Sequence, residues 1–222
     1  DKQAKSILNS AKRYLWDSSL GGFRLNTDFR DEQYDLGRAF SFIYGDKENG
    51  AFFNHMSVML AYALYKQKRA SEAWEVFSSV CEMALDTDKS KIYPCLPEYF
   101  NAEGRGMYSY LTGSASWFVL TLLTQVFGVR GKEGDLLIEP KLTAQQFRHA
   151  RVLSIRRNFC GRQLEIRFSN PQKLDYGRYR IIRATLDSRP LPAGHSCGLI
   201  ISRDSLLKLS AHSIHKIHIQ LG

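Results

Sequence analysis

Thr112, Gly113 and Ser114 form a short hydroxyl-and-glycine segment directly in front of an apolar run that ends at Phe127. The first backbone N–H groups of a helix have no acceptor inside the helix, and the helix dipole adds partial positive charge there. A phosphate is therefore a suitable ligand for Thr112, Gly113 and Ser114. The same three residues also fit an ordinary N-cap, in which Thr112 only satisfies its own helix.

A second candidate segment lies upstream, where a charged loop between Gly45 and Gly50 leads through two aromatic residues to another expected helix start. This loop-to-helix corner contributes Lys47, Glu48 and His55. Taken alone, Lys47 and Glu48 fit a solvated charge pair, and His55 fits a structural histidine. The segment becomes informative in combination with the rest of the chain.

Several ordered stretches resemble the glycoside phosphorylases of glycoside hydrolase family 94. The resemblance is strongest to the 1,2-β-oligoglucan phosphorylases and to the phosphorylase-like region of cyclic β-1,2-glucan synthases. The stretches that carry it are Leu20 to Asn26, Lys47 to Gly50, Asn54 to Met56, Pro97 to Phe100 and Gly104 to Trp117. It is firm over residues 13–142 and looser beyond them.

The resemblance implies an inverting reaction in which inorganic phosphate cleaves a β-glucosidic bond, β-1,2-glucan being favoured, and releases α-glucose 1-phosphate. Phosphate is already an anionic nucleophile, so it takes the place of the water and second carboxylate of an inverting glycosidase. The residues implied to contact phosphate are His55, Thr112, Gly113 and Ser114, and those implied to contact sugar are Lys47, Glu48, Glu98 and Tyr99. Phosphate is the co-substrate, and no metal or other cofactor is expected.

The catalytic residue is expected outside this chain. In the family the general acid is an aspartate in a Trp-Asn-Asp-type segment N-terminal to the matching region, and no such segment occurs here. We therefore expect the C-terminal portion of a phosphorylase, inactive alone, whose partners are a β-glucan oligosaccharide, phosphate, and the missing N-terminal barrel portion or a second subunit, with homodimerisation as one form of pairing. The alternative is a non-catalytic carbohydrate-binding or structural fragment, which would show no phosphate dependence.

The first half of the chain has helical periodicity. Helices are expected over residues 3–16, 54–66, 71–85 and from 112 or 113 to 127. Two long connections, 17–53 and 86–111, are expected to be loops without regular structure, and loops of that length are usually functional. The resemblance implies that these helices close an (α/α)6 barrel.

After Gly128 the pattern changes to short alternating segments separated by Pro, Gly, Asn and Ser. This pattern predicts an antiparallel β-sandwich, and the resemblance implies a jelly-roll-like domain. The expected strands lie at residues 136–138, 150–155, 163–168, 178–184, 198–201 and 215–221. The predicted fold is thus mixed α and β with two domains: residues 1–129 as the closing portion of the barrel and residues 130–222 as the sandwich.

The formal net charge of +9 raises the question of nucleic-acid binding, because basic residues crowd the sheet region. They are Arg148, Arg151, Arg156, Arg157, Arg162, Arg167, Lys173, Arg178, Arg180 and Arg183. A nucleic-acid groove would combine basic residues with exposed aromatics on one face, whereas these fall on both strand parities with few aromatics. We interpret them as solvated strand faces and as residues that pair with an absent N-terminal part, and we expect no nucleic-acid partner.

Composition also bounds the location and the chemistry. The 222 residues are 44% hydrophobic, which is enough for a core in one or two domains. No apolar run approaches a membrane span, and the polar start lacks a signal-peptide core, so direct membrane insertion is not expected. Four dispersed cysteines without a CxxC pair indicate neither zinc nor disulfides and favour the cytoplasm. His212, His215 and His218 are three residues apart, so on a strand the middle histidine would face away from the outer two, and the three are not expected to bind one metal.

Overall fold

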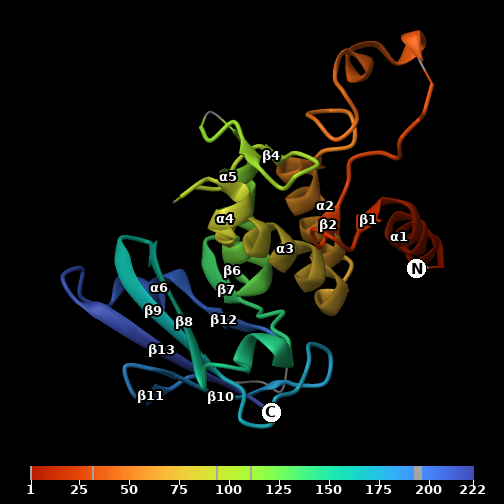
Figure 1. The fold of residues 1–222 in the computed structure, drawn as a ribbon. Helices are drawn as coiled ribbons and strands as arrows, with labels where there is room; N and C mark the ends of the chain where they lie inside the picture. The colour runs from red at the N-terminus through yellow and green to blue at the C-terminus, as the bar shows by residue number, and fades with distance from the viewer. Residues whose placement is uncertain (1, 32, 94, 111, 193–196) are drawn as a thin grey trace. The chain divides into compact units, whose positions relative to one another are not determined.

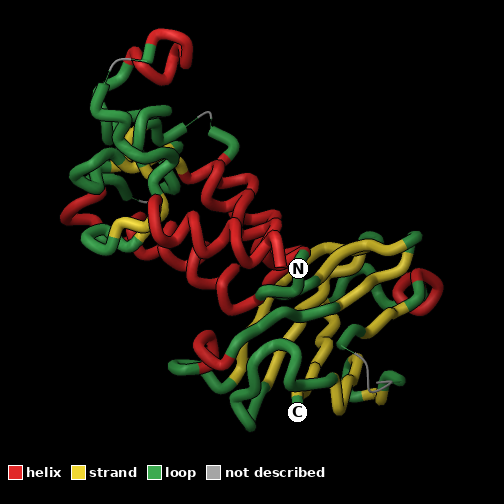
Figure 2. The backbone as a smooth tube through the Cα atoms, turned by 90° about the vertical axis from the view of Figure 1, so that its right-hand side faces the viewer, coloured by secondary structure: helices red, strands yellow, loops and turns green. Residues whose placement is uncertain are grey.

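The computed structural model describes residues 2–31, 33–93, 95–110, 112–192 and 197–222 (Figure 1). The chain divides into two compact units. The N-terminal unit comprises residues 1–64 and 72–121, and the C-terminal unit comprises residues 65–71 and 122–222. Long helices belong mainly to the N-terminal unit, whereas long strands belong to the C-terminal unit (Figure 2). The mixed α and β composition expected from the sequence is confirmed.

Helices α1 (Lys2–Leu15), α2 (Asn54–Lys66) and α3 (Ala70–Leu85) lie within a residue or so of their predicted bounds. The last predicted helix differs, because α5 (Ser114–Thr121) ends early and continues as a π-helical turn, η2 (Leu122–Val126). The Phe127 N–H donates to the Leu122 carbonyl five residues back, at 3.0 Å. Apolar periodicity cannot distinguish this wider turn from an α-helix.

The expectation of structureless connections is wrong. Residues 17–53 and 86–111 contain short elements, and the strands among them pair with one another. The elements are β1 (Trp16–Asp17), β2 (Gly22–Phe23), η1 (Tyr34–Ser41), β3 (Phe52–Phe53), α4 (Thr87–Ser90), β4 (Tyr99–Phe100) and β5 (Gly106–Met107). β1 pairs with β2, and β3, β4 and β5 form a three-stranded sheet in that order. Strands of two residues are too short for alternation to show in the sequence.

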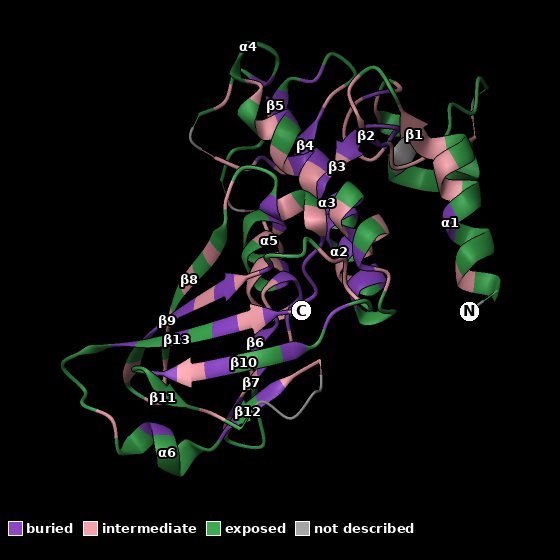
Figure 3. Ribbon diagram, turned by 90° about the horizontal axis from the view of Figure 1, so that it is seen from below, coloured by how far each residue is buried: buried purple, intermediate pink, exposed green. Residues whose placement is uncertain are grey.

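The described part of the C-terminal unit contains η2, two sheets and two further short helical turns. Its elements are β6 (Val129–Lys132), β7 (Asp135–Ile138), η3 (Ala144–Phe147), β8 (Val152–Phe159), β9 (Arg162–Ser169), β10 (Ile181–Leu186), β11 (Arg189–Pro190), β12 (Leu199–Ile201), α6 (Arg203–Leu207) and β13 (Ile214–Leu221). One sheet has the order β11-β10-β13-β9-β8 and the other β12-β7-β6. Buried and exposed residues alternate along β13, as expected for a strand with one covered face (Figure 3).

The larger sheet is mixed, which corrects the expectation of strictly antiparallel strands. β13 runs parallel to β9, with Ile217 opposite Ile166 and Ile219 opposite Phe168. A parallel pair needs a long crossover, and the segment between β9 and β13 provides it. Alternation shows which residues face inward but says nothing of strand direction, so the sequence pattern could not reveal this pair.

Candidate functional site

The three-stranded sheet β3-β4-β5 brings the candidate residues together within the N-terminal unit. Phe53 lies opposite Tyr99, and Tyr99 lies opposite Met107. β3 leads directly into α2, whose second residue is His55, and Glu98 immediately precedes β4. Segments distant in sequence therefore meet at one end of this small sheet.

The backbone of Glu98 joins these segments. Its carbonyl accepts the Asn54 N–H at 2.9 Å and the Ser114 hydroxyl at 3.4 Å, while its own N–H donates to the Tyr108 carbonyl at 2.9 Å. The Asn54 side-chain amide donates to the Pro97 carbonyl at 2.9 Å. The starts of α2 and α5 are thus hydrogen-bonded to the same strand end. Asn54, which the sequence reasoning did not single out, is fully buried in this junction.

His55 lies against the turn that precedes α5. A Cβ atom placed on Gly113 would be 2.8 Å from His55 Cε1, with the two ring nitrogens at 3.2 and 3.3 Å. Only a residue without a side chain permits this approach. The His55 ring centroid is also 6.2 Å from that of Trp117, one turn into α5. The structure therefore brings together the predicted phosphate residues from two separate segments.

Thr112 and Ser114 organise this turn. Thr112 Oγ1 accepts the Ser114 N–H at 3.2 Å and lies 3.0 Å from Ser114 Oγ. Thr112 and Gly113 are half-buried, whereas Ser114 is fully buried. The Thr112 hydroxyl therefore satisfies one N–H of the first turn of α5, as the N-cap interpretation expects, while Thr112 and Gly113 remain only partly buried. The hydrogen bond from the Ser114 hydroxyl to the Glu98 carbonyl attaches this turn to the end of β4.

Three of the four residues predicted to contact sugar are half-buried. Lys47 Nζ lies 4.1 Å from the Tyr108 ring centroid, and Glu48 Oε1 lies 3.8 Å from Arg38 Nε. Glu48 Oε2 is buried and has no hydrogen-bond partner among the described residues. Lys47 and Glu48 are both half-buried, as is Glu98.

Tyr99 is almost fully buried, at 2% exposure. Its ring stacks on Phe53 with centroids 6.1 Å apart. Burial raises the pKa of Tyr99, and a hydrogen bond with Asp46 and the charge of Asp46 act in the same direction. Tyr99 therefore supports the Lys47 loop from the sheet and is a poor direct contact for a ligand.

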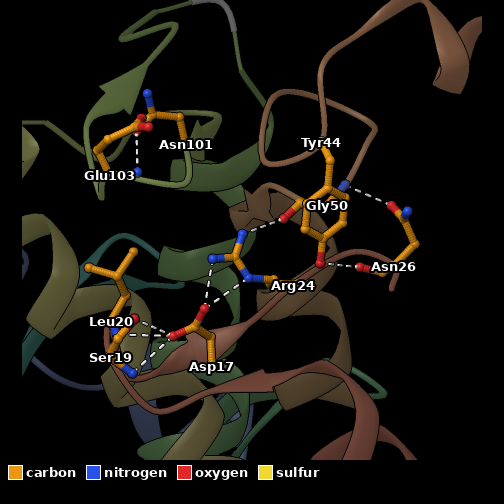
Figure 4. A network of polar contacts seen from close by, with 9 residues as sticks. All are labelled: Asp17, Ser19, Leu20, Arg24, Asn26, Tyr44, Gly50, Asn101 and Glu103. Carbon is orange, nitrogen blue, oxygen red and sulfur yellow. Dashed lines mark hydrogen bonds and ion pairs between the residues drawn. The ribbon is translucent and has the colours of Figure 1, made fainter. Parts of the chain in front are cut away.

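An ion pair that sequence reasoning missed fixes the resembling stretch around Leu20 to Asn26 (Figure 4). The Arg24 guanidinium binds Asp17 Oδ2 through Nε at 2.9 Å and a terminal nitrogen at 2.7 Å. Burial alone would raise the pKa of Asp17, but hydrogen bonds from Ser19 and Arg24 outweigh it and lower the pKa. Asp17 therefore remains ionised beside Arg24.

Arg24 also connects the β1–β2 hairpin with the loop between Gly45 and Gly50, which carries Lys47 (Figure 4). Its other terminal nitrogen donates to the Gly50 carbonyl at 3.0 Å, and Asn26 Oδ1 accepts the Gly50 N–H at 2.7 Å. The Tyr44 hydroxyl donates to the Asn26 carbonyl at 3.4 Å. Gly50 has φ +76° and a Cβ there would be 2.2 Å from the Tyr44 ring, so glycine is required. These contacts fix the loop that carries Lys47 and Glu48.

Within the described ranges, no group of three or more His, Cys, Asp or Glu side chains could hold a metal ion. His215, from the histidine trio, is buried and bonds Asp187 at 2.6 Å and the Ser210 carbonyl at 2.9 Å. The four cysteines are free thiols. Among the helices of the described residues, none combines the length and apolar character that a membrane span requires.

Comparison with known protein families identifies the class to which the chain belongs. The family model described as Glycosyl hydrolase 94 superfamily, catalytic domain, matches residues 1–128. The chain therefore belongs to the Glycosyl hydrolase 94 superfamily, and the resemblance noted in the sequence is confirmed.

Similar proteins include enzymes of two kinds. The chain is 30% identical over 111 residues to the cyclic β-(1,2)-glucan synthase NdvB of Rhizobium meliloti (strain 1021), covering 46% of this chain and 4% of that protein. It is 23% identical over 174 residues to the 3-O-β-D-glucopyranosyl-β-D-glucuronide phosphorylase of Paenibacillus borealis, covering 74% and 22%. It is 23% identical over 190 residues to the N,N'-diacetylchitobiose phosphorylase of Vibrio furnissii, covering 82% and 23%. The chain thus spans less than a quarter of the length of each of these relatives.

Proposed function

We propose that this chain is the C-terminal part of an inverting glycoside phosphorylase, which cleaves β-glucosidic bonds of oligosaccharides with inorganic phosphate. Residues 1–129 would be the closing part of an (α/α)6 barrel and residues 130–222 its β-sandwich domain. The observation that carries the proposal is the contact between His55 and Gly113 at the start of α5. It places an imidazole beside a helix N-terminus, where backbone donors and the helix dipole favour an anion.

In the proposed reaction a phosphate oxygen attacks the anomeric carbon in line with the scissile bond. The new bond joins that oxygen to the anomeric carbon, the glycosidic C–O bond breaks, and the leaving oxygen takes a proton from the general acid upstream of this chain. Inversion converts the β-linkage into α-glucose 1-phosphate. His55, Thr112 and Gly113 would hold the phosphate, and the buried Ser114 hydroxyl would position Thr112.

Glu48 and Lys47 would bind the sugar next to the phosphate. Glu48 Oε2 is a buried acceptor with no partner among the described residues, and such groups carry a free-energy cost unless something donates to them. A sugar hydroxyl would supply that donor. Lys47, held over the Tyr108 ring, would donate to neighbouring hydroxyls, with Glu98 and Tyr99 assisting from the sheet.

The helices of the N-terminal unit support the proposal of a missing partner portion. The apolar residues of α5 are not confined to one side of the helix, as is typical of a helix enclosed by others. Nevertheless Val119 is 52% exposed, and on α1 Ile7 and Tyr14 are each 60% exposed. An N-terminal barrel portion, or a second subunit, would cover these side chains and supply the general acid. We therefore propose that the chain alone is inactive.

We further propose β-1,2-glucan as the favoured substrate. The similarity to a cyclic β-(1,2)-glucan synthase supports this choice over the sugars named for the two phosphorylases. A cytoplasmic location is proposed as well, because four free thiols suit a reducing compartment.

Calorimetric titration of inorganic phosphate tests the proposal, with and without a short β-1,2-glucan. Wild type is compared with His55→Ala and Thr112→Ala, and His212→Ala and Thr27→Ala serve as matched controls at exposed positions. We expect phosphate binding that both site variants abolish and both controls retain. Adding the N-terminal portion of a family member should then restore release of glucose 1-phosphate. A folded wild-type chain that binds no phosphate would refute the proposal and favour a structural or carbohydrate-binding fragment.

A further inference from the structure

One face of the larger sheet in the C-terminal unit is hollowed by two adjoining cavities. The first, of about 360 Å³, is lined by residues of β8, β9, β10 and β13. The second, of about 750 Å³, lies against the segments that precede β8 and follow β9. Val152, Ser169 and Gln220 line both. The two cavities therefore form one continuous groove, named here the basic groove.

Strand register explains how the groove is built. Arg167 lies opposite His218 on β13, and His218 lies opposite Thr185 on β10. In the next row of the same face, Gln220 lies opposite Arg183. The side chains of these rows project from one side of the sheet, because their neighbours along each strand are buried on the other side.

The outer part of the groove comes from the chain on either side of the β8–β9 pair. Val152 lies opposite Ser169, so the residues before β8 and after β9 meet at the same end of the sheet. These segments contribute Arg148, Arg151 and Lys173, all of them exposed. Arginines that seemed scattered along the sequence are thus collected along one groove.

The charge of the groove is of one sign. Its described lining includes five residues with fixed positive charge, namely Arg148, Arg151, Arg167, Lys173 and Arg183, and none with a carboxylate. Arg167 also bonds Glu165 at 3.1 Å, which lies outside the described lining. A groove of one sign attracts a ligand of the opposite sign.

The remaining lining residues indicate the chemistry of that ligand. Ser169, Thr185, Ser188 and Gln220 can each donate and accept, which suits a ligand that carries hydroxyls as well as charges. The lining phenylalanines, Phe147 and Phe168, are 3% and 0% exposed and offer no face on which bases could stack. The exposed rings of the lining are the small imidazoles of His149 and His218. These features favour a sugar chain with acidic groups over a nucleic acid.

We propose that the basic groove binds an acidic oligosaccharide, a chain of sugars with carboxylates along its length. The lining lies wholly in the C-terminal unit, whereas the residues proposed to bind phosphate lie in the N-terminal unit. The carboxylates would pair with the arginines and Lys173, while the sugar hydroxyls would bond the serine, threonine and glutamine side chains.

Titration of an oligogalacturonate into the full chain by calorimetry tests this assignment. The groove variant Arg167→Gln with Arg183→Gln is compared with the control Arg203→Gln with Lys208→Gln, which removes the same charge around α6. We expect binding that weakens about tenfold or more in the groove variant and with added salt, but is retained in the control. Equal melting temperatures of the two variants would show that the groove variant is folded.

Three results would overturn the proposal. One is an absence of oligogalacturonate binding to the wild-type chain at low salt. Another is an equal loss of affinity in the groove variant and the control, which would show that net charge alone attracts the ligand. The third is that a single-stranded oligonucleotide or an acidic peptide of matched charge binds as tightly as oligogalacturonate or more tightly. A neutral malto-oligosaccharide serves as the uncharged control ligand.

Discussion

Gly113→Ala tests the contact on which the proposed phosphate site depends. The new methyl group would meet His55 Cε1 at 2.8 Å, so the ring must retreat by about 0.6 Å to reach an ordinary contact of 3.4 Å. Overpacking of this kind costs about 1–3 kcal/mol in the free energy of unfolding. In a chain of this length each kcal/mol lowers the melting temperature by about 2–4 °C.

The substitution should also weaken phosphate binding. A hydrogen bond to a charged group contributes about 1.5–3 kcal/mol. Displacing the His55 imidazole from its proposed hydrogen bond to phosphate should therefore weaken phosphate affinity about 10- to 100-fold. Thermal unfolding and phosphate calorimetry measure the two effects. Gly131→Ala is the matched control, because its new methyl group would lie 3.6 Å from the nearest Phe159 atom. If Gly113→Ala melts and binds phosphate as Gly131→Ala does, the inferred packing of His55 is wrong.

Three further predictions concern charged groups. Arg24→Lys should lower the free energy of unfolding by about 1–3 kcal/mol, because lysine cannot reproduce the two hydrogen bonds to Asp17. Urea denaturation measures this change, and unchanged stability would contradict the prediction. Burial lowers the pKa of Lys141 from 10.5 to about 8. The unfolded chain therefore binds more protons between about pH 8 and 10.5, and the stability of wild type relative to Lys141→Met should rise with pH through that window. The hydrogen bond that the His215 ring donates to the Asp187 carboxylate raises the pKa of His215. Its stabilisation should be complete below the unfolded pKa and lost as pH rises through the folded pKa, so His215→Gln should destabilise the chain more at pH 6 than at pH 9 in denaturant titrations.

The positions of the long elements follow from local patterns. α2 and α3 carry apolar residues at helical spacing, and β13 alternates between buried and exposed residues, so their bounds could be predicted closely. The residue types at Thr112, Gly113 and Ser114 likewise predicted the helix start, which the structure has at Ser114, while the anion site there stays a prediction. Such inferences succeed because each depends on neighbours within a few residues along the chain.

Tertiary pairing decided the rest. The sheet β3-β4-β5 joins two-residue strands from separate loops, and only this pairing brings His55 against Gly113. The parallel pairing of β9 with β13 depends on a crossover that no local pattern encodes.

The basic groove shows the same distinction between sequence and tertiary structure. The sequence pattern was interpreted as solvated strand faces, whereas Arg148 and Lys173, from the segments before β8 and after β9, line the same groove as Arg167 and Arg183. The sequence by itself therefore determined which segments form the long helices and strands, because backbone periodicity is a local property. Only the tertiary structure decided which side chains face one another, because contacts between distant segments depend on strand order and direction.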